Sequence, residues 1–155
     1  MFIPETYGGQ FYINLPYGEV NIGNFKYSSI SLMSDAGDVS IEEAENISAN
    51  LSYGDLEIGK ARTIYALCNT GDIEIGEVDS FCNLEVELGN IEIENCNIDS
   101  ESDLHIDCGD IKIDKTSDVN IEASTSFGDT RVAHSNASSP VKLTAIVDAG
   151  DIKIN

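Results

Sequence analysis

Short stretches in which apolar and polar residues alternate recur along the whole chain, each around a glycine that is usually followed by an acidic residue. The eight copies are GEVNI from Gly18, GDVSI from Gly37, GDLEI from Gly54, GDIEI from Gly71, GNIEI from Gly89, GDIKI from Gly109, GDTRV from Gly128 and GDIKI from Gly150. Side chains of a β-strand alternate between two faces, whereas a helix would repeat every 3.6 residues. The pattern therefore predicts an all-β, single-chain β-solenoid of about eight coils of about 19 residues.

When the copies are aligned on this glycine, the inward-facing positions stand out. Positions −7, −5, −3, −1, +2, +4 and +7 relative to the glycine are mostly apolar, and those between them are mostly polar. We expect position +4 to stack as an aliphatic ladder of Ile22, Ile41, Ile58, Ile75, Ile93, Ile113, Val132 and Ile154. Position −1 is also assigned to the interior, which would bury Tyr17, Tyr53 and Phe127.

The length of the repeat varies in only one part of each copy. No copy gains or loses a residue between −7 and +4, so the loops lie between +5 and −8, and the longest is AHSNASSPVK at 133–142. A single domain of residues 1–155 is expected, with a cap segment at 1–10 and repeat coils at 11–155. Phe2, Ile3 and Tyr7 would cover the first coil, and the Gly150 coil would end the solenoid without a cap.

Composition narrows the range of partners. The chain carries 28 acidic against 8 basic residues, a formal charge of −20, and residues 63–111 contain 13 acidic residues and no Lys or Arg. Such a surface repels phosphate backbones and anionic headgroups, so we expect neither nucleic-acid binding nor membrane binding. No segment has the roughly 20 apolar residues of a membrane span.

The phrase GD-[IV]-x-[IV], preceded by alternating stretches such as VNIEASTSFGD and followed by a variable loop, resembles a bacterial family of adhesin-type β-solenoid repeat domains. The resemblance covers residues 11–154. It implies a right-handed β-helix and a place at the cell envelope, and it brings no catalytic motif. Because the start MFIPETYGGQ does not have the pattern of a signal peptide or anchor, a cytoplasmic location stays open.

Position +1 forms the clearest line of candidate ligands. It holds Glu19, Asp38, Asp55, Asp72, Asn90, Asp110, Asp129 and Asp151. Successive coils would place these side chains about 4.8 Å apart. The favoured role is closure of the bend, in which Asp bonds nearby backbone amides. Calcium binding is the alternative, with Asp38, Asp55, Asp72, Asp110, Asp129 and Asp151 as candidate ligands. No cofactor is predicted.

The four cysteines do not form a metal motif. Cys68, Cys82, Cys96 and Cys108 are spaced 14, 14 and 12 residues apart, without a C-x-x-C pair. All four occupy inward positions and are expected to be buried thiols. A Cys82–Cys96 disulfide across a loop corner is the alternative.

Catalytic chemistry has little support in the sequence. His105 occupies an outward position, and His134 precedes Ser135 in the longest loop, where a nucleophile would still need an orienting group and an oxyanion site. Glu74 and Glu92 resemble the carboxylate pairs of polysaccharide-cleaving β-helices, but they belong to a regular acidic face. No catalytic residue is assigned, and the chain is predicted not to be an enzyme.

The sequence thus predicts a non-enzymatic structural or binding module that presents its loops and its acidic face to a protein or cell-envelope partner. Two alternatives stay open. The first is a scaffold that forms homo-oligomers through the ends of the solenoid, in particular the Gly150 coil. The second is a glycan-cleaving β-helical enzyme.

Overall fold

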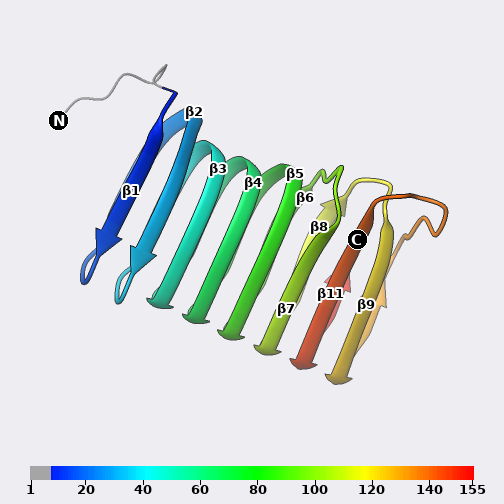
Figure 1. Ribbon diagram of the computed structural model, residues 1–155. Coiled ribbons are helices and arrows are strands. Elements are labelled where there is room, and N and C mark those ends of the chain that lie inside the picture. The colour runs from blue at the N-terminus through cyan, green and yellow to red at the C-terminus, as the bar shows by residue number, and fades with distance from the viewer. Residues whose placement is uncertain (1–7) are drawn as a thin grey trace.

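A computed structural model describes residues 8–155, and in this range the chain forms one parallel sheet of twelve strands wound into a solenoid (Figure 1). The strands are β1 (Gln10–Leu15), β2 (Val20–Ser34), β3 (Val39–Tyr53), β4 (Leu56–Thr70), β5 (Ile73–Leu88), β6 (Ile91–Cys96), β7 (Ser102–Cys108), β8 (Ile111–Thr116), β9 (Asn120–Phe127), β10 (Thr130–Val132), β11 (Lys142–Ala149) and β12 (Ile152–Ile154). The predicted all-β solenoid is confirmed. The expected cap residues Phe2, Ile3 and Tyr7 lie outside the described residues.

Strands β2 to β5 each run from one glycine bend to the next and cover two faces of their coil. Their register brings equivalent repeat positions together, as in the pairs Ile41–Ile58, Ile58–Ile75 and Ile75–Ile93. The predicted aliphatic ladder is confirmed, since its members from Ile41 to Ile113 and Ile154 are buried. None of the described residues belongs to a helix long and apolar enough to cross a membrane.

The coils do not stack in the order of the chain. Strand β11 pairs with β7 on one side and with β9 on the other, and β12 likewise lies between β8 and β10. Figure 1 shows β11, in red, between β7 and β9. The segment 142–154 is therefore inserted between two coils that precede it in the sequence. The prediction that the Gly150 coil ends the solenoid is wrong, and the β9–β10 coil lies at that end.

The glycine bends show how closely the inserted coil is packed. Gly150 has a φ of 145°, and a Cβ atom on it would lie 2.0 Å from the carbonyl oxygen of Gly109. A Cβ atom on Gly128 would lie 1.9 Å from the carbonyl oxygen of Gly150. Both distances are too short for any side chain. The insertion is possible because the connection between Val132 and Lys142 is the longest in the repeat array, and closing a longer loop costs little extra entropy.

Position −1 differs from its predicted place. Tyr17, Tyr53 and Phe127 are 80%, 63% and 79% exposed, although alternation assigned them to the core. The residue before each glycine already lies on the outside of the bend, so the alternation changes phase one position earlier than predicted. The other buried apolar residues follow the predicted columns, except Ile98 and Val119 in the connections before β7 and β9, and they form a single core cluster.

Candidate functional site

Position +1 forms a continuous chain of hydrogen bonds along one corner of the solenoid, which we call the aspartate ladder. Its members, in spatial order, are Asp38, Asp55, Asp72, Asn90, Asp110, Asp151 and Asp129. The side-chain Oδ1 of each of the first six accepts the backbone N–H of the next member, at N···O distances of 2.7–3.0 Å. The bonds thus join consecutive coils, whereas the sequence predicted bonds within one bend.

The ladder gives its carboxylates a structural role that requires no ion. Among the six calcium candidates, Asp38, Asp55, Asp72, Asp110 and Asp151 accept a backbone N–H through Oδ1, and Asp129 donates its N–H as the last member. Glu19, at the equivalent position of the first coil, accepts from the Asn21 amide instead. Calcium binding by the ladder stays a prediction.

A second row of carboxylates lies beside the ladder, at position +3. Glu57, Glu74 and Glu92, together with Glu94, line a shallow groove that runs over the backbone of Gly59 and Gly76. Glu74 and Glu92 are register neighbours on adjacent strands, as their repeat positions predict. Glu92 forms an ion pair with Lys112, and this hydrogen bond raises the pKa of the lysine. The row of position +3 is therefore acidic from Glu57 to Glu92, and at Lys112 it continues with a basic side chain that pairs with Glu92.

Large apolar side chains project from the same corner, on the other side of the glycines. We call Tyr17, Tyr53, Leu88 and Phe127 the apolar ridge; Leu88 is 53% exposed, and the other three are more exposed. Each ridge residue directly precedes a glycine, and a ladder residue follows that glycine from Tyr53 onward. The apolar ridge was missed at the sequence level because strict alternation assigned position −1 to the core. Thr70 at this position was the one polar member that could have indicated exposure.

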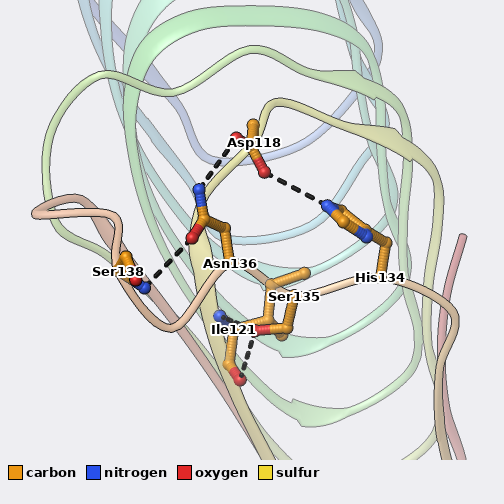
Figure 2. Close-up of polar contacts among 6 residues, drawn as sticks. All are labelled: Asp118, Ile121, His134, Ser135, Asn136 and Ser138. Atoms are coloured by element: carbon orange, nitrogen blue, oxygen red, sulfur yellow. Dashed lines mark hydrogen bonds and ion pairs between the residues drawn. The ribbon is translucent and has the colours of Figure 1, made fainter.

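The longest loop is fixed to the end coil by a small polar network (Figure 2). Asp118 accepts a hydrogen bond from the side-chain amide of Asn136 at 2.8 Å, and its other carboxylate oxygen lies 3.1 Å from Nε2 of His134. Both contacts hold the pKa of Asp118 below its usual value, the Asn136 bond contributing most. The amide oxygen of Asn136 accepts the backbone N–H of Ser138. These bonds give the loop a defined conformation.

His134 and Ser135, the pair considered as base and nucleophile, have separate partners. The His134 ring faces Asp118, while the Ser135 hydroxyl accepts the N–H of Ile121 at 2.8 Å and donates to its carbonyl oxygen at 3.4 Å (Figure 2). Ser135 thereby occupies part of the outer edge of β9. This arrangement gives both side chains a structural role, which is to attach the loop to the end coil.

Three of the four cysteines are buried as predicted, and all four are free thiols. Burial raises the pKa of Cys68 to about 11. The pKa of Cys82 is also raised, because its thiol bonds that of Cys96 in the apolar interior. The prediction that Cys108 is buried is wrong, since it occupies the exposed position −1.

The comparison with protein families connects this geometry to a known class. A family model described as Toastrack DUF4097 matches residues 1–155. The chain belongs to the Toastrack DUF4097 family. Searches of the curated proteins and of the solved structures gave no significant match. Membership in Toastrack DUF4097 agrees with the solenoid fold, and the family description attaches no activity to it.

Proposed function

We propose that this Toastrack domain is a non-enzymatic binding module of adhesin type that holds a basic, partly apolar segment of a protein or cell-envelope partner along its Gly-Asp corner. The observation that carries the proposal is the position of the apolar ridge next to the aspartate ladder. Exposed aromatic and aliphatic side chains would provide contact area, and the carboxylates would select for positive charge.

Two features of the corner support an extended partner. Ladder residues occupy consecutive coils from Asp38 onward, about 4.8 Å apart, and ridge residues occupy every second coil from Tyr17 to Leu88. The net charge of −20 would attract a basic partner over a distance and accelerate its association. Such binding is expected to weaken as ionic strength rises, because salt screens exposed charges.

The proposal can be tested with two synthetic peptides, one with alternating Lys and Leu and one with alternating Glu and Leu. We expect binding of the Lys peptide only, measured by fluorescence anisotropy, and weaker binding by Tyr53→Ser and Leu88→Ser. Met33→Ser is the matched control, since Met33 is 58% exposed but lies on a flat face of the solenoid. Equal binding by all variants would contradict the proposal.

End-to-end association is a second candidate. Within residues 8–155, strand β9 pairs only with β11; Ser135 occupies its outer edge at Ile121, and the remainder of that edge, up to the exposed Phe127, has no strand partner. An unpaired strand edge with apolar residues is a template for another strand. Self-association would therefore use the β9–β10 coil. Light scattering over a wide range of protein concentration would show growth if this candidate is right, and a constant monomer mass if it is wrong.

A further inference from the structure

We propose that His105, Asp107 and Asp148 form a binding site for a first-row divalent metal ion such as Zn²⁺. The site lies on the outward face of β7 and β11, where Asp107 and Asp148 each stand two residues before a glycine of the Gly-Asp corner, and it includes no residue of the apolar ridge or of the aspartate ladder. It is independent of the peptide-binding function proposed above.

The three side chains already have a suitable arrangement. One ligand atom from each, an imidazole nitrogen and two carboxylate oxygens, lies within 4.8 Å of the other two. His105 Nε2 is 3.8 Å from Asp107 Oδ1. Ligands at about 2.1 Å from one zinc ion are roughly 3 to 3.5 Å apart, so small side-chain rotations bring these atoms into range. One imidazole and two carboxylates suit a borderline divalent ion and leave further positions for water.

The insertion of β11 creates this cluster. Asp148 lies opposite Asp107, because the flanking residues Val147 and Ala149 pair with Ile106 and Cys108. If the coils stacked in chain order, β9 would lie beside β7 and would place Ser126 at this position. A serine would replace the third ligand. The site therefore exists only in the observed stacking order.

The surroundings add negative charge, and among residues 8–155 no ion pair joins the three side chains to a Lys or Arg. Glu85 lies opposite His105 on the neighbouring strand β5, and Glu87 follows two residues later on the same face. A rotation of the Glu85 side chain toward His105 would let its carboxylate orient the imidazole ring. Carboxylates next to a metal-binding histidine are a usual means of fixing its orientation.

The experiment is a calorimetric titration with zinc chloride near pH 7, in a Cys108→Ser background that removes the exposed thiol. We expect one zinc ion per chain, and affinity at least about tenfold lower in His105→Ala and in Asp148→Asn. His134→Ala is the control, because His134 has only Asp118 as an acidic neighbour among the ion pairs of the described residues. His105, Asp148 and His134 are all partly or fully exposed, so circular dichroism should show that the three variants fold as the unsubstituted protein does.

A second measurement detects the site without relying on affinity. Zinc that joins β7 to β11 should slow amide hydrogen exchange in residues 142–149 of the Cys108→Ser protein. It should not slow this exchange when Asp148→Asn is added. Calcium chloride, which prefers oxygen ligands, should not give this protection. Zinc affinity that is unchanged in both ligand variants, or no heat of binding up to millimolar zinc, would overturn the proposal.

Discussion

The backbone N–H of Asp129 donates to Oδ1 of Asp151 at 2.8 Å, although Asp151 follows it by 22 residues. In the same ladder, the N–H of Asp151 donates to Asp110, 41 residues earlier in the chain. These two bonds reflect the reversed order of the last two coils, in which the Gly150 coil lies between the Gly109 coil and the Gly128 coil. In both bonds the Asp side chain joins two coils, and we therefore expect its acceptor oxygen to matter more for stability than its charge.

We expect Asp72→Asn to be nearly neutral and Asp72→Ala to lower the free energy of unfolding by about 1 kcal/mol. The amide oxygen of Asn can accept the N–H of Asn90 as Asp72 does, and Asn90 already plays this role for Asp110. The alanine leaves the N–H without its acceptor. Urea unfolding measures the difference, and equal losses in both variants would indicate that the charge is what matters.

The stacking order predicts which engineered cysteines can be linked. In a Cys108→Ser background, Asp103→Cys with Thr144→Cys should oxidise readily, because these positions are register partners on β7 and β11. Their Cα atoms are about 4.8 Å apart, within the range that a disulfide needs.

Asp103→Cys with Glu122→Cys is the matched control for this experiment. Glu122 pairs with Thr144 from the far side, so it lies two strands from Asp103, about 10 Å away. Non-reducing electrophoresis would separate the linked forms. Preferential linkage of 103 to 122 would mean that the coils follow chain order.

Shortening one side chain of the aliphatic ladder should strongly reduce the stability of the fold. Ile93→Ala should destabilise the fold by about 2 to 5 kcal/mol, because Ile93 is fully buried and a cavity would remain. Ile146→Ala, at an exposed position of β11, should cost about 0.5 kcal/mol or less. Thermal melts of both variants provide the comparison, and similar melting temperatures would contradict the assigned core.

Most of the fold could be predicted from the sequence, because burial requires apolar side chains at alternate positions and all eight copies show them. The order of the coils could not be predicted. Alternation alone does not say which copy packs on the Gly109 coil, although the Gly128 copy has Thr125 and Thr130 at inward positions where the Gly150 copy has Val147 and Ile152. The His105–Asp107–Asp148 cluster was missed for the same reason, since it depends on which strand lies beside β7.

The thiols should differ in reactivity. Iodoacetamide at pH 8 should label only Cys108 in the folded protein, because it is exposed while Cys68, Cys82 and Cys96 are buried. The pKa of about 11 for Cys68 keeps it in the unreactive thiol form at this pH. Mass spectrometry would show one label, four after unfolding in guanidinium, and none on folded Cys108→Ser. Rapid labelling of Cys68 in the folded state would contradict this prediction.

Attachment of the loop should depend on pH through Asp118. Its pKa is lowered from the ordinary 3.8 by the bonds from Asn136 and His134. The contribution of ionised Asp118 to stability is therefore fully present at pH values above its ordinary pKa. It is lost as the pH falls through the lowered pKa of the folded protein.

NMR signals of the Asn136 side-chain amide, followed from pH 6 to pH 2, would report this loss. Asp118→Asn keeps an acceptor but cannot titrate, so its Asn136 signals should stay constant in the same range. An identical transition in Asp118→Asn would assign the effect to another group.

The inserted coil also constrains how the protein folds during synthesis. At about 5 to 20 residues per second, a ribosome needs roughly 1 to 4 s to proceed from Asp129 to Asp151. Strands β9 and β10 pair only with β11 and β12 among the described residues, so they leave the exit tunnel before their partners do. The first six coils can stack one after another as they emerge. The last two must reach their native places together, after translation has passed residue 154.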